Sequence, residues 1–156
     1  MRVFHHETVT ATARPGTSPV EVDVRGGGGG DDDGFGAALV LPAALGGSPR
    51  AGTTNPEQLF GSAYSGCMVF AIDHAARLAK LDPAVLEGLE VTASVKIGRA
   101  TDRTNHLEAD LLVRLPALTD ANAEALCQQA VRYCPFHQAL EGNVTTSFRV
   151  TGSGTA

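Results

Sequence analysis

The sequence predicts a single domain of the α+β class, residues 1–156, in which antiparallel sheets pack around one buried helix. Apolar and polar residues alternate over 20–24, 89–97 and 107–115, which is the period of half-buried strands. A helix-start signal at Asn55 precedes a long segment of apolar and small residues. Strands and helices therefore come in groups rather than in strict alternation, as α+β folds require.

Length and charge narrow the possible functions. The 156 residues can bury a core without disulfide or metal support. A net charge of −5 and a pI of 5.4 argue against nucleic acid and anionic membrane as partners. No apolar run has the length of a signal peptide or a membrane span, so we expect a cytoplasmic protein. Three cysteines, an odd number, suit a reducing compartment.

The N-terminal third indicates strands and loops. Residues 8–12 and 20–24 are predicted strands, and the turn-forming residues between them predict a hairpin with Arg14 at its tip. Residues 26–34, five glycines followed by aspartates and a glycine, are expected to form a flexible surface loop. The aspartates raise the alternative of a calcium site, but the EF-hand pattern is absent. Residues 35–41 are a third candidate strand.

The central helix has the clearest start signal. Asn55 can cap it, Pro56 suits the first helical position, and Glu57 complements the positive end of the helix dipole. Apolar and small residues cover nearly all its sides, which predicts a buried helix with Cys67 at its middle. Asp82-Pro83 marks the end of this region.

The C-terminal half begins with a predicted antiparallel hairpin formed by 89–97 and 107–115. Thr119 or Asp120 then caps a helix that runs toward Cys134-Pro135. Proline cannot continue an undisturbed helix, so the chain must kink, break or restart there. Residues 144–150 are predicted to form the last strand.

Two of the cysteines are candidates for chemistry. Cys67 by itself could be a small buried core residue. Cys134 lies beside a helix N-terminus if a helix restarts at Pro135, and backbone N–H groups there favour a thiolate. Cys127 is interpreted as structural.

A zinc site is an alternative. Cys67, Cys127, Cys134, His74 and His137 offer enough ligands, although their spacings do not match the paired knuckles of structural zinc sites. The histidines taken singly favour ordinary helix positions, and His137 is interpreted as solvated.

A reactive Cys67 would need a positive charge nearby. Glu57 is ten residues away, about 15 Å along a helix axis, and has the wrong sign. Arg14 at the hairpin tip is the candidate, since a guanidinium lowers the pKa of a thiol, and Glu57 could orient it. In the simpler alternative, Arg14 and Glu57 are ordinary charged residues on the protein surface.

Two motifs carry a family resemblance. Residues 54–67 (TNPEQLFGSAYSGC) closely resemble the central helix of the organic hydroperoxide resistance (Ohr) proteins, which belong to the wider family of osmotically inducible protein C (OsmC). Residues 134–143 (CPFHQALEGN) resemble their second cysteine motif, and the order of elements agrees over nearly the whole chain. His137 and Glu141 depart from that motif, which usually has a small polar residue and an arginine at these positions. The sequence flanking Arg14 departs from the family pattern by about one residue.

The resemblance implies an intertwined homodimer and a peroxidase cycle without flavin, haem or metal. The Cys67 thiolate would attack an organic hydroperoxide, release an alcohol and become a sulfenic acid. Cys134 would then form a disulfide with Cys67, which a dithiol such as protein-bound dihydrolipoamide reduces. Arg14 and Glu57 would be the charged pair of this site.

The apolar neighbours of Cys67 favour alkyl hydroperoxides over hydrogen peroxide as substrates. The alternative function is that of an OsmC-like relative that senses redox state or binds a ligand with little turnover.

Overall fold

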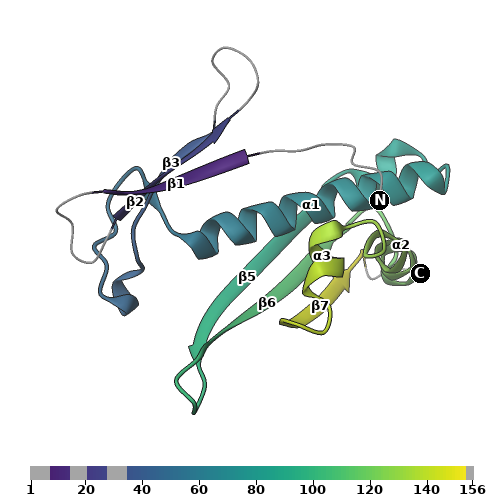
Figure 1. The fold of residues 1–156 in the computed structure, drawn as a ribbon. Coiled ribbons are helices and arrows are strands. Elements are labelled where there is room, and N and C mark those ends of the chain that lie inside the picture. The colour runs from purple at the N-terminus through teal and green to yellow at the C-terminus, as the bar shows by residue number, and fades with distance from the viewer. Residues whose placement is uncertain (1–7, 15–20, 28–34, 154–156) are drawn as a thin grey trace. The chain divides into compact units, whose positions relative to one another are not determined.

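The computed structural model describes residues 8–14, 21–27 and 35–153 (Figure 1). The chain divides into two compact units, Met1–Leu59 and Phe60–Ala156. Each unit contains one sheet, and the helix α1 begins in the first unit and continues through the second. The single domain predicted from the sequence stays a prediction.

The sheet of the first unit has the order β1-β2-β3-β4. Its strands are β1 (Thr8–Arg14), β2 (Glu21–Gly27), β3 (Gly36–Leu39) and β4 (Thr53–Thr54). The predicted pairing of the first two strands is confirmed: β1 and β2 are antiparallel, and Arg14 and Glu21 are their last pair. The third predicted strand is also confirmed.

The glycine-rich loop begins later than expected. Gly26 and Gly27 belong to β2 and pair with Val9 and Thr8 of β1. Cross-strand hydrogen bonds therefore extend the strand in spite of the low strand propensity of glycine. The rest of the expected loop, 28–34, lies outside the described residues.

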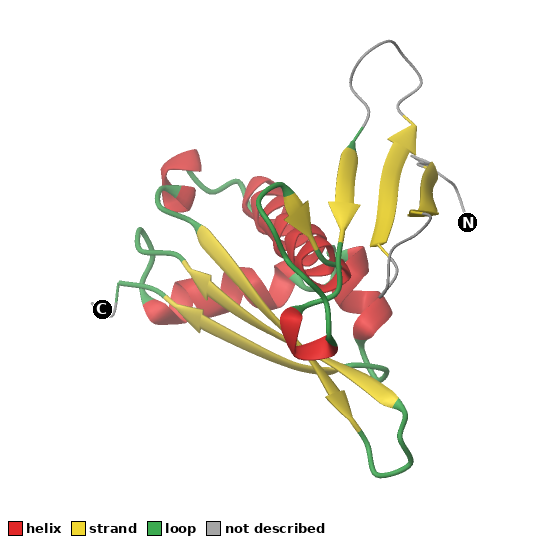
Figure 2. Cartoon of the chain, turned by 90° about the vertical axis from the view of Figure 1, so that its left-hand side faces the viewer, coloured by secondary structure: helices red, strands yellow, loops and turns green. Residues whose placement is uncertain are grey.

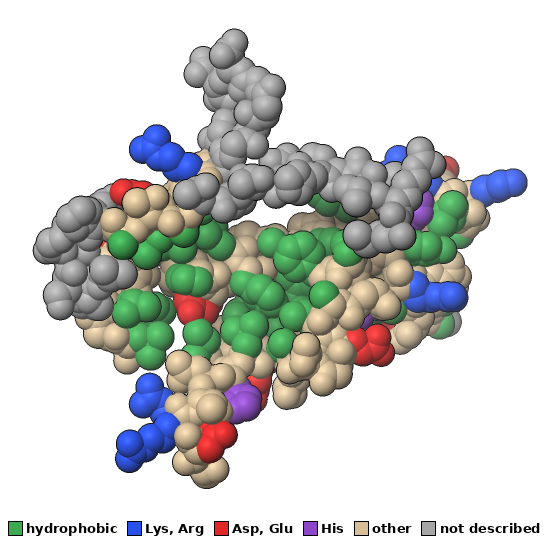
Figure 3. Space-filling model, viewed as in Figure 1, with side chains coloured by type: hydrophobic (Ala, Val, Ile, Leu, Met, Phe, Trp, Pro, Cys, Tyr) green, Lys and Arg blue, Asp and Glu red, His purple; other side chains and the backbone are tan. Residues whose placement is uncertain are grey.

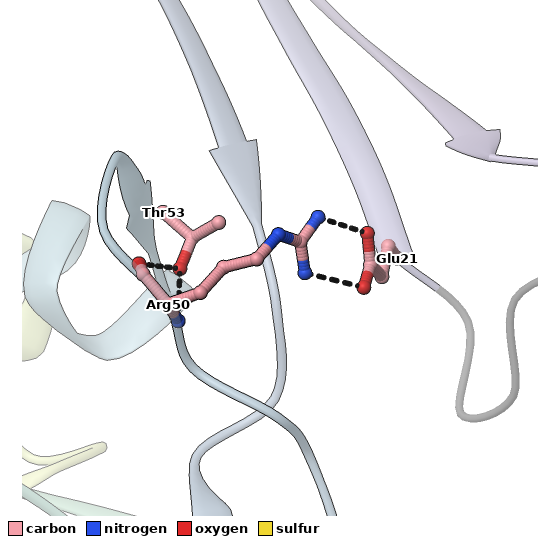
Figure 4. Close-up of polar contacts among 3 residues, drawn as sticks. All are labelled: Glu21, Arg50 and Thr53. Atoms are coloured by element: carbon pink, nitrogen blue, oxygen red, sulfur yellow. Dashed lines mark hydrogen bonds and ion pairs between the residues drawn. The ribbon is translucent and has the colours of Figure 1, made fainter.

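Arg50 ties the segment before α1 to the start of β2 (Figure 4). Its guanidinium forms a two-pronged ion pair with Glu21, with both N–O distances at 2.7 Å. The Thr53 hydroxyl accepts a hydrogen bond from the Arg50 backbone N–H and donates one to the Arg50 carbonyl. This contact fixes the strand end at which Glu21 pairs with Arg14.

Helix α1 (Pro56–Leu78) starts where the sequence predicts. The Asn55 side chain accepts a hydrogen bond from the Gln58 N–H at 2.8 Å, as an N-cap does. Only one face of the helix is buried within the chain, by residues three or four apart: Gly61, Tyr64, Met68, Ala71, Ile72, Ala75 and Ala76. Phe70, in contrast, is 75% exposed. The other side of α1 thus carries apolar surface, such as Phe70, that is exposed among the described residues.

The second unit contains the sheet β5-β6-β7 (Figure 2). The single-turn helix η2 (Pro83–Leu86) precedes β5 (Glu90–Arg99), which pairs with β6 (Asn105–Arg114) as the predicted antiparallel hairpin. The last strand, β7 (Thr145–Thr151), lies parallel to β6. A Cβ at Gly61 would lie 3.3 Å from the Val95 side chain, so glycine allows α1 to approach β5 closely.

Two short helices complete this unit. Helix α2 (Asp120–Ala130) has Thr119 as its N-cap, and helix α3 (Pro135–Leu140) has Cys134 as its N-cap. The chain therefore breaks and restarts at Cys134-Pro135, so Cys127 and Cys134 do not lie on one continuous helix. The core contains the largest fully buried side chains: Tyr64, Met68, Ile72, Leu111, Leu115, Val113, Cys127 and Cys134.

The predicted α+β class is confirmed, although each sheet also contains one parallel pair, β3–β4 and β6–β7. Both β4 and β7 return to their sheets after longer connections, where strand direction follows from packing rather than from local pattern. Among the described residues, none of the helices combines the length and the apolarity that crossing a bilayer requires.

Candidate active site

The centre of the site is a pair of thiols from distant parts of the chain. Cys67 lies at the middle of α1, and Cys134 lies at the N-terminus of α3. The Cys134 Sγ donates a hydrogen bond to the Cys67 Sγ at 3.3 Å. Cys134 is fully buried, Cys67 is half-buried, and both are free thiols. Because a disulfide has an S–S length of about 2.05 Å, a small approach of the sulfurs would join them.

The break at Pro135 determines the environment of Cys134. Its Sγ accepts a hydrogen bond from the backbone N–H of His137 at 3.4 Å. Burial raises the pKa of Cys134 to about 11, and the N–H groups of His137 and Phe136 act in the opposite direction. The helix N-terminus therefore favours the thiolate as expected, but desolvation outweighs it. At neutral pH Cys134 is a thiol, and its S–H can donate the hydrogen bond to the Cys67 Sγ.

Tyr64 and His137 form a second pair next to the thiols. Tyr64, one turn before Cys67 on α1, is 1% exposed, and its hydroxyl lies 2.8 Å from the His137 Nδ1. Burial, with Cys134 and Cys67 nearby, raises the pKa of Tyr64 to about 12. Burial lowers the pKa of His137. At pH 7 a neutral imidazole therefore pairs with a protonated tyrosine, and the tyrosine O–H is the donor when the imidazole proton lies on Nε2.

The expectation that His137 is a solvated helix residue is wrong. Its ring is partly buried, bonded to Tyr64, and edge-on to Phe148 of β7 at a centroid distance of 5.9 Å. Tyr64 and His137 are 73 residues apart in the chain. The only sequence signal for this role was the position of His137 three residues after Cys134, because no local pattern reports a contact across the core.

Cys127 is separate from the thiol pair. It lies in the core with no exposed surface, and burial raises its pKa to about 12. This environment fits the structural interpretation. The zinc alternative finds no support in the part of the chain that the structure describes, where no three His, Cys, Asp or Glu side chains could hold a metal ion.

The charged residues of the expected site are only partly described by the structure. Glu57 lies in the first turn of α1, and its Oε2 is buried with no hydrogen-bond donor among the described residues. Arg14 is the last residue of β1, but its side chain lies outside the described residues. Its role, and that of Glu57, stays a prediction. Arg50 was not predicted from the sequence as a site residue. It forms an ion pair with Glu21, which pairs with Arg14 in the register of β1 and β2.

These features define an α+β protein with a partly buried dithiol centre that a small movement could close into a disulfide. The comparisons then place it in a family. The chain belongs to the OsmC-like protein family, whose model matches residues 47–149.

Relatives and solved structures of this family are similar over most of the chain. An organic hydroperoxide resistance protein-like 2 of Staphylococcus epidermidis is 33% identical over 117 residues, covering 75% of this chain and 80% of the relative. The organic hydroperoxide resistance protein OhrA of Bacillus subtilis is 32% identical over 117 residues, covering 72% and 80%. The crystal structure of an organic hydroperoxide resistance protein from Elizabethkingia anophelis superposes with a TM-score of 0.82 at 27% identity, covering 97% and 99%.

Proposed function

We propose that this protein is a cysteine-based peroxidase that reduces organic hydroperoxides to alcohols. The observation that carries the proposal is the 3.3 Å contact between the sulfurs of Cys67 and Cys134. The names of the relatives, organic hydroperoxide resistance proteins, support the substrate class.

In the proposed cycle the Cys67 thiolate attacks one peroxide oxygen. The O–O bond breaks, the alcohol leaves with a proton, and Cys67 becomes a sulfenic acid. The Cys134 sulfur then displaces the sulfenic oxygen as water and forms the disulfide. A dithiol, of which protein-bound dihydrolipoamide is the proposed example, reduces this disulfide by thiol–disulfide exchange.

The test of this function is steady-state consumption of hydroperoxide with dihydrolipoamide or dithiothreitol as the reductant. Cumene and tert-butyl hydroperoxide should be consumed faster than hydrogen peroxide, because Cys67 packs against the hydrophobic core, which favours an apolar substrate. A folded protein that forms the disulfide once but does not turn over would favour the alternative, a redox-sensing relative.

The proposed role of Arg14 is to supply positive charge to Cys67, with Glu57 orienting the guanidinium. A buried Glu57 oxygen with no donor among the described residues supports this role, because a buried carboxylate needs a cation or a hydrogen bond. Arg14→Ala should slow the alkylation of Cys67 by iodoacetamide at pH 7 by at least about tenfold, since less thiolate would be present. Arg25→Ala, at an exposed position in the same sheet, is the matched control. Equal alkylation rates in both variants would exclude Arg14 from the site.

We also propose that two copies of the chain form a homodimer. The exposed apolar side chains Phe70, Leu78 and Leu81 lie on or just after α1, and Figure 3 shows hydrophobic side chains along the course of this helix. Burying one such side chain contributes about 1.5–3 kcal/mol. Sedimentation should show a dimer for the wild type and for Phe70→Leu, and dissociation for Phe70→Asp. A monomeric wild type at micromolar concentration would contradict the proposal.

A further inference from the structure

We propose that Tyr64 and His137 are positioning residues, whose hydrogen bond holds Cys134 opposite Cys67 and so favours the disulfide over the two free thiols. The inference deepens the proposed function, because it rests on the Cys67–Cys134 disulfide of that cycle. It concerns where the second sulfur is held, and it assigns no bond-making or bond-breaking step to either Tyr64 or His137.

Helix α3 does not hold Cys134 in place by itself. It has only six residues, and isolated helices shorter than about 12–15 residues are marginal in water. The chain breaks just before it, at Cys134-Pro135, so α3 is not a continuation of α2. Helix α1, in contrast, has 23 residues and contributes much of the core. The position of Cys134 therefore depends on contacts that tie α3 to a longer element.

Two contacts of matching spacing join α1 to the start of α3. Tyr64 lies three residues before Cys67 on α1, so the two side chains are neighbours on one side of that helix. His137 lies three residues after Cys134. The Tyr64 hydroxyl is 2.8 Å from the His137 Nδ1, and the Cys134 Sγ is 3.3 Å from the Cys67 Sγ. The first contact therefore holds the chain where the second can form.

His137 links the two contacts through its own atoms. Its ring bonds to Tyr64, and its backbone N–H donates a hydrogen bond to the Cys134 Sγ at 3.4 Å. Tyr64 is a fixed anchor, because it is 1% exposed and belongs to the core. Phe148 of β7 packs edge-on against the His137 ring at 5.9 Å. A displacement of the His137 ring would thus also move the N–H group that holds the sulfur.

Such a tether favours the disulfide through entropy. The S–S bond requires two sulfurs about 2.05 Å apart with a defined dihedral angle. A thiol that is already held near its partner loses little freedom when this bond forms, which is the basis of a high effective concentration. Without the tether, the dithiol form gains freedom and the disulfide becomes less favoured. The change is limited to about three- to tenfold, the range that one neutral hydrogen bond supports.

The test is the equilibrium of the Cys67–Cys134 pair in mixtures of reduced and oxidised glutathione at pH 7. One oxidised glutathione takes up the two hydrogens of the protein thiols and becomes two reduced molecules, while the protein gains one S–S bond. Alkylation of the free thiols in denaturant, followed by mass spectrometry, gives the fraction of each state. Tyr64→Phe should lower the equilibrium constant for disulfide formation by about three- to tenfold, which raises the reduction potential by about 15–30 mV.

Variants at His137 separate the hydrogen bond from the bulk of the side chain. His137→Leu fills a similar space without a polar atom and should lower the constant as Tyr64→Phe does. His137→Asn should restore it to within about twofold of the wild type, because its amide oxygen is attached to Cγ, as Nδ1 is, and can accept the tyrosine hydrogen bond. The double variant Tyr64→Phe/His137→Leu should be no lower than either single variant, as expected for partners in one contact. His137 is partly exposed, so its variants carry the test if Tyr64→Phe does not fold.

The matched control is Gln138→Leu. The side-chain amide of Gln138, the next residue of α3, donates a hydrogen bond to the Val131 carbonyl at the end of α2, at 3.1 Å. This contact is exposed and does not reach α1, so water can replace it and the constant should stay within about twofold of the wild type. An equal fall in Gln138→Leu, or a wild-type or higher constant in both Tyr64→Phe and His137→Leu, would overturn the positioning role.

The glutathione equilibrium involves no peroxide, so it distinguishes failure of this inference from failure of the proposed function. A wild type that forms the disulfide in glutathione but does not consume cumene hydroperoxide would contradict the peroxidase function alone, and the variants would still decide the positioning role. A wild type that forms no Cys67–Cys134 disulfide in oxidised glutathione would overturn the positioning role together with the resolving role of Cys134.

Discussion

Replacing Cys67 with serine is expected to lower kcat/KM for cumene hydroperoxide by at least about a thousandfold. A serine hydroxyl does not ionise at neutral pH and is a poor nucleophile toward peroxide oxygen, whereas a thiolate is a strong one. The other two thiols cannot substitute for it. Cys127 and Cys134 are fully buried, and burial raises the pKa of Cys127 to about 12 and that of Cys134 to about 11.

The measurement is steady-state peroxide consumption with dihydrolipoamide as the reductant. Far-ultraviolet circular dichroism and thermal unfolding would show that Cys67→Ser keeps the fold, as expected for a half-buried position. Cys127→Ser is the matched control, because it also removes one thiol and should keep wild-type turnover. Activity within tenfold of wild type in Cys67→Ser would exclude Cys67 as the nucleophile.

Replacing Cys134 with serine is expected to leave the first oxidation of Cys67 intact but to cause loss of activity in later turnovers. The first oxidation should proceed at close to the wild-type rate, because the attack on peroxide needs only Cys67. The sulfenic acid then has no resolving thiol at 3.3 Å and remains open to further peroxide. Its oxidation to sulfinic acid is irreversible for most proteins, so activity should decay within tens of turnovers, by an estimated tenfold or more.

Mass spectrometry checks this outcome directly. After excess cumene hydroperoxide, the Cys67 peptide of Cys134→Ser should carry two added oxygens, whereas the wild type should carry the Cys67–Cys134 disulfide. Cys127→Ser should again match the wild type in chemistry, although a buried hydroxyl should cost about 1–3 kcal/mol of unfolding free energy. A Cys134→Ser protein that stays active through hundreds of turnovers would show that Cys134 does not protect Cys67.

The local chemistry of the sequence accounts for most of the secondary structure. The cap at Asn55, the cap at Thr119 and the break at Pro135 each depend on one or two residues and their own backbone, and all three appear as predicted. Alternating patterns likewise located β5 and β6, since period-two alternation reports which side chains face a core. Long-range pairing is different: the pairing of Gly26 and Gly27 with β1 contradicts the local propensity of glycine.

The sequence by itself determined the fold class, the two cysteine motifs and the family to which they point, because these depend on residue order and short-range pattern. Only the tertiary structure decided which side chains meet. The Cys67–Cys134 contact joins side chains that are 67 positions apart in the chain. The Tyr64–His137 hydrogen bond joins side chains that are 73 positions apart. The tertiary structure also decided that burial raises the pKa of Cys134 more than the backbone N–H groups at the helix N-terminus lower it. The physical reason is that contact and desolvation depend on how α1, α3 and β7 pack together, and no local pattern of residues encodes that packing.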